Sequence, residues 1–162
     1  DLRKAADMIR ETESVTVISH IDADGISTEA ILAQAITREE IPVNSVFLRQ
    51  LEPMAMRHIP EDDSLKLFAD LGAGQQSLLE GHGLSADEVL ILDHHVSQPC
   101  GTTYPQVNCL DHGITRMSAA GVAHLVAKTI DSTSIDLAKL AVIGNVGDMM
   151  ARENCGLVGP AR

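Results

Sequence analysis

The chain lacks features that would each place it in a different class of protein. Every apolar stretch is broken by Asp, Ser or Gly well short of the roughly 20 residues that a membrane-spanning helix needs. No CxxC spacing is present, and the three cysteines, Cys100, Cys109 and Cys155, are an odd number, which argues against a disulfide framework and a zinc ribbon. We therefore expect a cytoplasmic protein with no membrane partner.

Positive charge is also scarce. Lys and Arg number 12 against 23 Asp and Glu, which gives a formal net charge of -11. This balance argues against nucleic acid as a partner, because binding the phosphate backbone depends on Lys and Arg. The objection weakens if several of the acids hold metal ions, since bound dications would add positive charge at the place where a phosphate must sit.

The length and the first residue bear on domain organisation. A chain of 162 residues with 44% apolar content can bury one substantial core, so we predict a single domain over residues 1–162. The chain begins with Asp1 rather than with methionine, and no targeting segment opens it. We therefore expect a fragment of a longer protein.

Short apolar runs alternate with segments of helical periodicity along the chain. Strands are predicted at residues 15–19, 43–48, 65–69 and 89–92, and helices at residues 2–10, 28–35, 117–130 and 135–143. This alternation favours an α/β fold, with a mainly parallel β-sheet flanked by helices on both faces. Ligands of such sheets bind beyond the carboxyl ends of the strands, where three polar clusters of this chain fall.

The first of these clusters is His20-Ile21-Asp22-Ala23-Asp24-Gly25. In an extended backbone the side chains of His20, Asp22 and Asp24 would point the same way, and Gly25 would allow a sharp turn behind them. The alternative is a polar loop in which an Asp caps the following helix. Taken alone, the cluster leaves both interpretations open.

Two further clusters follow predicted strands. Asp70 precedes a glycine-rich turn, where a turn residue or a helix cap is the simpler explanation. In Asp93-His94-His95, neighbouring side chains of an extended segment would point apart, so one His could bind a metal while the other faces the substrate. Asp93 could hold an imidazole in the required tautomer. Surface loop histidines are the alternative.

Asp148, at the end of an apolar segment, completes a possible ligand set. Two metals need about six protein ligands, and six are available at His20, Asp22, Asp24, Asp70, His94 and Asp148. Converging carboxylates would repel one another strongly without bound cations. Carboxylate and imidazole ligands without thiolate favour Mn²⁺, with Mg²⁺, Co²⁺, zinc or iron as alternatives.

The remaining candidates have structural explanations. His112 follows Asp111, but no buried strand precedes the pair, so we expect a loop residue there. His58, His82 and His124 are expected at surface or helix positions. The small residues from position 118 to 121 are expected to form a helix face that packs closely on the sheet.

Taken in order, the motifs at residues 20–25, Asp70, Asp93-His94-His95 and Gly147-Asp148 resemble the four motifs of the DHH phosphoesterase superfamily. The match spans nearly the whole chain. Residues 70–75, 118–123 and 147–150 look most like the archaeal homologues of RecJ, a single-strand exonuclease. Family pyrophosphatases place the first His further from the acids, which argues against that branch.

The resemblance implies a role for each motif residue. His20 and Asp22 would hold one metal, His94 with Asp24 and Asp148 would hold the other, and Asp70 would bridge the two. His95 would contact the scissile phosphate, and Asp93 would support the histidines. The family normally carries a second domain of the DHHA1 type after the fourth motif, which we expect in the parent protein.

The implied function is manganese-dependent exonucleolytic hydrolysis of single-stranded DNA or RNA, in DNA repair or replication. One alternative is a phosphodiesterase or phosphatase for small substrates such as oligonucleotides, cyclic dinucleotides or nucleoside bisphosphates. Another is a replication scaffold that binds GINS-type partners. The presence of all six proposed ligands argues against a purely structural role.

Overall fold

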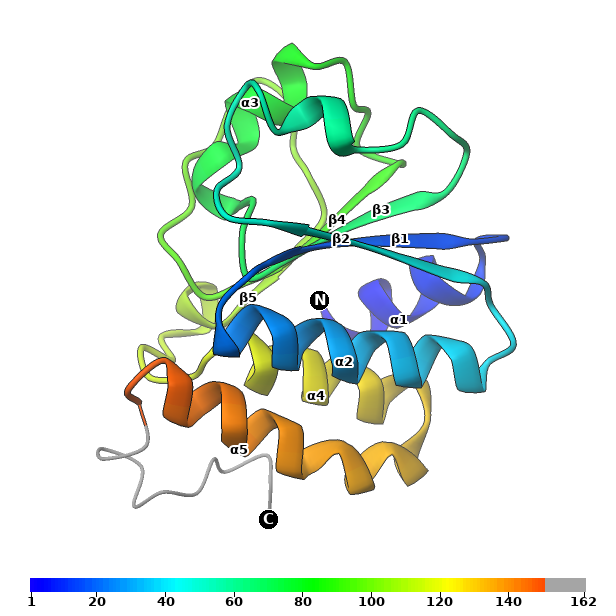
Figure 1. Ribbon diagram of the computed structural model, residues 1–162, viewed down its shortest axis with the longest axis vertical. Helices are drawn as coiled ribbons and strands as arrows, with labels where there is room; N and C mark the ends of the chain where they lie inside the picture. The colour runs from blue at the N-terminus through cyan, green and yellow to red at the C-terminus, as the bar shows by residue number, and fades with distance from the viewer. Residues whose placement is uncertain (151–162) are drawn as a thin grey trace.

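In the computed structural model, which describes residues 1–150, five parallel strands form one sheet (Figure 1). The strands are β1 Val15–His20, β2 Val43–Leu48, β3 Leu65–Ala69, β4 Val89–Asp93 and β5 Gln106–Asn108. Their order across the sheet is β2-β1-β3-β4-β5, and each neighbouring pair runs parallel. The predicted parallel α/β fold is confirmed, with β5 as an additional edge strand.

Helices cover both faces of this sheet. The helices α1 Leu2–Arg10, α2 Ala23–Arg38, α4 Ala119–Ile130 and α5 Ala138–Gly147 lie on one side, and α3 Gln76–Gly81 lies on the other (Figure 1). The described residues also form short 3-10 turns: η1 Met56–His58, η2 Ala73–Gln75, η3 Cys109–His112 and η4 Ser132–Leu137. Among the described residues, no helix is both long enough and apolar enough to cross a membrane.

The central strands are buried on both faces because helices cover both sides. All five residues of β3 are buried, Lys66 included. Leu65, Leu67 and Ala69 pack into the core beneath α1, α2 and α4, whereas Phe68 packs into the smaller core on the α3 side. This alternation follows the two-residue period of a strand, and it explains the nearly continuous apolar runs in the sequence.

The chain reverses its direction of travel across the sheet between β1 and β3. The connection from β1 through α2 leads outward to β2, and the chain then returns to place β3 on the other side of β1. At such a reversal the connections leave in opposite directions and open a crevice at the carboxyl ends of the strands. His20 ends β1 and Asp70 follows β3, so both residues lie at this crevice.

Candidate metal centre

The first motif does not continue the strand beyond His20. Asp22 is the N-cap of α2, and its carboxylate accepts a hydrogen bond of 2.9 Å from the backbone N–H of Gly25. The expectation of an extended segment with a turn at Gly25 is therefore wrong, because α2 begins at Ala23 and places Asp24 in its first turn. Gly25 has a different function: a Cβ at this position would clash with the backbone carbonyl of His20.

The first possible ligand group is His20, Asp22 and Asp70, whose ligand atoms lie within 4.8 Å of one another. The Nδ1 of His20 lies 2.8 Å from Asp22 Oδ2 and 3.7 Å from Asp70 Oδ2. The Nε2 of His20 lies 3.1 Å from the carbonyl of Arg49. Because a carbonyl can only accept, Nε2 donates there, which turns Nδ1 toward the two carboxylates. A cation between these atoms would be bound by one imidazole nitrogen and two carboxylates.

The second possible ligand group is Asp24, His94 and Asp148, also within 4.8 Å. The Nε2 of His94 lies 3.8 Å from Asp24 Oδ2 and 3.5 Å from Asp148 Oδ2. Asp24 is buried and held from behind, since its two oxygens accept hydrogen bonds from the backbone N–H groups of Ala119 at 2.8 Å and Ala120 at 3.0 Å. These N–H groups begin α4, whose N-terminal partial positive charge favours a carboxylate.

Asp70 lies between the two groups. Its Oδ2 faces His20, whereas its Oδ1 lies 3.3 Å from Nε2 of His94. Its backbone has a φ of 60°, a left-handed conformation that costs on the order of 1–3 kcal/mol in a residue other than glycine. Burial raises the pKa of Asp70 to about 6, and the charges of Asp24 and Asp22 add to this effect. The position is therefore unfavourable for an unneutralised carboxylate.

Two buried polar atoms at the centre of this cluster have no hydrogen-bond partner, Oδ1 of Asp70 and Nε2 of His94. Leaving such groups unsatisfied usually costs about 1–3 kcal/mol each. Both atoms are good ligands for a divalent cation, and they face each other. The donor set therefore fits divalent metal ions, which would satisfy both atoms and offset the charge of the surrounding carboxylates.

Asp93 and His95 form a separate pair beside the cluster. Oδ1 of Asp93 accepts from Nδ1 of His95 at 2.7 Å and from the backbone N–H of His94 at 2.7 Å, and Oδ2 accepts from the N–H of Ala73 at 3.0 Å. Burial alone would raise the pKa of Asp93, but these hydrogen bonds lower it. Asp93 also lies within ligand distance of Asp70 and the histidines. Donors already occupy both of its oxygens, and this favours a positioning role for Asp93 over metal binding.

The imidazole of His95 is more than half exposed, in contrast to the buried ring of His94. The hydrogen bond to Asp93 raises the pKa of His95 to about 9, so the ring is a cation at neutral pH. Its ring lies 4.2 Å from that of His94, measured between centroids. A fixed cation at the edge of the cluster is suited to contact an anionic substrate.

The cluster opens into a pocket of about 200 Å³. Besides the residues already described, the pocket is lined by Arg49, Gln50, Leu51, Leu71 and Gln75. Sequence reasoning missed Arg49 and Gln50, although a polar pair directly after the strand at residues 43–48 follows the same rule as the other strand ends. Arg49 brings a permanent positive charge to an otherwise acidic site.

Comparison with known protein families shows to which family the chain belongs. Residues 14–145 match the model described as the DHH family, N-terminal domain. The chain belongs to the DHH family. A relative from Methanocaldococcus jannaschii, the uncharacterised protein MJ0831, is 28% identical to this DHH chain over 155 residues, covering 88% of this chain and 34% of the relative. The chain thus spans about a third of that protein's length.

Solved structures share the fold of this DHH domain. Exonuclease RecJ bound to manganese has a TM-score of 0.71 and 23% identity, with coverage of 91% of this chain and 43% of RecJ. RecJ from Thermus thermophilus in complex with Mn²⁺ has a TM-score of 0.70 and 24% identity, covering 91% and 24%. CDC45 from Entamoeba histolytica has a TM-score of 0.66 and 17% identity, covering 93% and 32%. At these identities the likeness establishes the fold alone.

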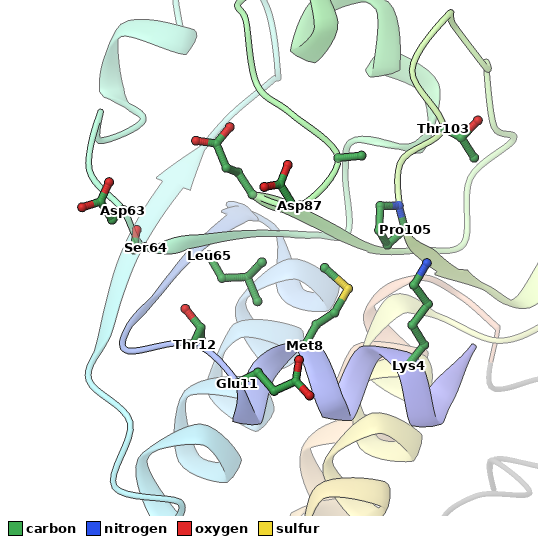
Figure 2. A pocket seen from close by; sticks show the side chains of 12 residues that line it. Lys4, Met8, Glu11, Thr12, Asp63, Ser64, Leu65, Asp87, Thr103 and Pro105 are labelled. Atoms are coloured by element: carbon green, nitrogen blue, oxygen red, sulfur yellow. The ribbon is translucent and has the colours of Figure 1, made fainter.

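A larger hollow, of about 620 Å³, lies at the opposite edge of the sheet in this DHH domain (Figure 2). Met8 and Leu65 lie at its centre, and the carboxylates of Glu11, Asp63 and Asp87 lie around it (Figure 2). No histidine is among the described residues that line it. Despite its size, this hollow has none of the buried, unsatisfied ligand atoms that mark the carboxyl edge.

Within residues 1–150, none of the other histidines and cysteines belongs to a ligand group. His112 ends η3, and its Nε2 lies 3.0 Å from Asp1 Oδ2 at the surface. His124 is fully buried within α4. Cys100 and Cys109 are free thiols, and Cys155 lies outside the described residues.

Proposed function

We propose that this DHH domain is the catalytic part of a RecJ-like exonuclease that hydrolyses phosphodiester bonds of single-stranded DNA or RNA with two divalent cations. The supporting observation is the pair of ligand groups that meet at Asp70, with its buried Oδ1 facing His94 unsatisfied. The solved RecJ structures contain Mn²⁺ or Mg²⁺, and we accordingly propose Mn²⁺ as the preferred ion, with Mg²⁺ or Co²⁺ as substitutes.

In this proposal each residue of the site has a defined task. His20, Asp22 and Asp70 would hold one cation, and Asp70, Asp24, His94 and Asp148 would hold the other. Bound there, the cations would lower the pKa of water to supply hydroxide and offset charge on the attacking and leaving oxygens.

The charged residues at the rim would handle the phosphate itself. The imidazolium of His95, held by Asp93, would bind an oxygen of the scissile phosphate and keep it in line for attack. Arg49, which lines the same pocket, would bind a neighbouring phosphate. Both groups are positively charged at neutral pH without any metal. They would therefore be in place to orient the phosphates before the reaction begins.

The test is metal analysis of the purified chain, paired with hydrolysis of end-labelled single-stranded DNA and RNA in Mn²⁺. We expect two bound ions per chain and metal-dependent release of nucleotides. Asp70→Ala should lose both metal and activity, whereas Asp63→Ala at the opposite edge should keep both. Nuclease activity that survives Asp70→Ala would refute the assignment.

We also propose that the parent protein is cytoplasmic and carries a DHHA1-type domain after this one. A second candidate function, a scaffold for GINS-type replication partners, is favoured by the likeness of the fold to CDC45. A pull-down with purified GINS-type proteins separates the two candidates, because a scaffold would bind with or without metal and would not release nucleotides. The small-substrate phosphodiesterase is distinguished by its preference for short over long substrates.

A further inference from the structure

A second groove, of about 330 Å³, lies next to the catalytic pocket at the carboxyl end of β2. Residues of β2, of the segment after it and of η1 line this groove, with Phe47, Arg49, Gln50, Met54, Arg57 and His58 among them. Arg49 and Gln50 line both the groove and the catalytic pocket. The two hollows therefore adjoin each other at Arg49 and Gln50.

The charge of this groove is opposite to that of the chain as a whole. The chain has a formal net charge of -11, yet two arginines and a histidine line the groove against one carboxylate, Glu52. Within residues 1–150, neither Arg49 nor Arg57 forms an ion pair with Asp or Glu; Nε of Arg57 lies 3.5 Å from Nε2 of His58. These two guanidinium groups are therefore available to an anionic ligand.

Exposed apolar side chains accompany these cations. Phe47 is 44% exposed, although it lies on a strand, and Met54 is 61% exposed. The other two aromatic residues of the chain, Phe68 and Tyr104, are buried. Single exposed apolar residues are common on protein surfaces and require no explanation. An exposed aromatic residue among the residues that line a groove, together with two arginines that form no ion pair, is however the combination with which proteins bind single-stranded nucleic acid, by stacking and by phosphate contacts.

We propose that this groove holds the part of the substrate strand that continues beyond the cleaved nucleotide. Arg49 contacts the phosphate nearest the metal centre, Arg57 contacts the next, and Phe47 stacks on a base at the rim. The inference rests on the proposed function, and it narrows the substrate to a polynucleotide strand rather than an isolated small phosphoester. Stacking accepts any base, so the groove binds without sequence preference.

The experiment compares Phe47→Ala and Arg57→Gln with the wild-type chain on substrates of different length. The probes are thymidine 5′-monophosphate p-nitrophenyl ester, which is too short to enter the groove, and 5′-labelled dT₁₂ and rU₁₂, each with Mn²⁺. We expect Phe47→Ala to raise KM for dT₁₂ roughly fivefold or more, and to raise it more for the 12-mer than for the small ester. The rU₁₂ arm shows whether the groove accepts RNA as well as DNA.

Salt dependence distinguishes a phosphate contact from a structural role for Arg57. The slope of log Kd for fluorescein-labelled dT₁₂ against log salt should fall by about 0.7 in Arg57→Gln, the value for one phosphate contact with a single strand. Arg3→Gln on α1 and Ile135→Ala on η4 are matched controls for lost charge and lost apolar surface, and both should behave as the wild type.

The outcomes separate the groove from the metal centre. If the wild type hydrolyses neither ester nor oligonucleotide with Mn²⁺, the proposed function fails, and dT₁₂ binding still tests the groove. If both variants bind and cleave dT₁₂ as the wild type does, or lose ester and 12-mer hydrolysis equally, the groove does not carry the strand. Competition by a 12-residue poly-glutamate peptide as effective as that by unlabelled dT₁₂ would assign the groove to an acidic protein partner instead.

Discussion

The two ends of β3 each carry a buried charge, and their surroundings differ. At the amino end, Nζ of Lys66 donates to Oδ1 of Asp62 and the carbonyl of Ser64, both at 2.9 Å, and to the carbonyl of Asp62. Beyond the carboxyl end, Asp70 has an unsatisfied oxygen, a left-handed backbone and two carboxylates as neighbours. The buried charge of Lys66 is fully satisfied by the protein, whereas Asp70 keeps one oxygen without a hydrogen-bond partner.

The same contrast distinguishes the hollows at the two edges of the sheet. The acids around the amino-edge hollow are exposed, so water can solvate them (Figure 2). At the carboxyl edge, Asp24 and Asp70 are buried, and a bound cation would offset their mutual repulsion. Burial without satisfaction is therefore a better guide to the functional site than the volume of the hollow.

The largest expected effect comes from removing the charge at the carboxyl end. Asp70→Asn should lower Mn²⁺-dependent hydrolysis by more than about 100-fold, since even outer-shell residues of metal sites contribute 10–100-fold. The metal-free variant should be at least as stable as the metal-free wild type, because the substitution removes repulsion with Asp22 and Asp24. Initial rates and metal-free thermal melts measure the two effects. A large loss of metal-free stability would show that Asp70 has a structural role, and would remove the contrast with Lys66.

A substitution at Gly25 tests how much the close contact between α2 and the end of β1 contributes to stability. Gly25→Ala would place a methyl group against the His20 carbonyl, which should destabilise the fold by about 3 kcal/mol. Gly81→Ala is the matched control, because a Cβ at the end of α3 meets nothing within 4 Å and should leave stability equal or up to about 1 kcal/mol higher. Denaturant unfolding measures both. Equal stability of Gly25→Ala and wild type would mean that the start of α2 can move away from His20 at little cost in free energy.

Addition of Mn²⁺ should stabilise the folded chain through binding at the carboxyl edge of the sheet alone. At each of the two proposed sites, free Mn²⁺ at about 100 times Kd stabilises the folded state by about 2.7 kcal/mol, which corresponds to roughly 5–10 °C in Tm per site. The shift should disappear in Asp70→Asn and persist in Asp62→Asn. A shift of the same size in all three proteins would place the bound metal elsewhere on this acidic chain.

The fold was predictable where periodicity extends over several residues. The strands at 43–48 and 65–69 have the bounds predicted from their apolar runs. The pattern did not indicate β5, because three residues are too few to display a period, nor α3, which is a six-residue helix. The helix predicted at 28–35 begins earlier, at Ala23, because Asp22 caps it and the first turn is made of polar and small residues.

The candidate site was predictable as a set of strand ends, but not as a geometry. Parallel strands place His20, Asp70 and His94 at the same edge whatever the details of the loops. Asp24 is held by the N-terminus of α4, through backbone N–H groups that lie 95 and 96 positions further along the chain. No pattern in the sequence around Asp24 predicts such a long-range contact. The carbonyl of Arg49 that orients His20 is likewise contributed by a different strand end, and its role depends on the backbone rather than on residue type.

The smallest expected effect is the pH dependence of stability that Asp62 contributes at the amino end of β3. The side chains of Ser64 and Lys66 lower the pKa of Asp62 to about 2. The folded state then binds this proton less readily than the unfolded chain does, so the stabilisation is complete above the ordinary pKa near 4 and is lost as the pH falls through about 2.

Because the carboxylate of Asp62 is half exposed, the contribution should be only about 1 kcal/mol. Asp62→Asn should therefore be less stable than the wild type at pH 7, and the difference should shrink between pH 4 and pH 2 in urea unfolding. Mn²⁺-dependent hydrolysis at pH 7 should be unchanged, since Asp62 lies at the edge opposite the metal centre. A difference in stability that stays constant down to pH 2 would mean that the loss in Asp62→Asn does not come from the charge of the carboxylate.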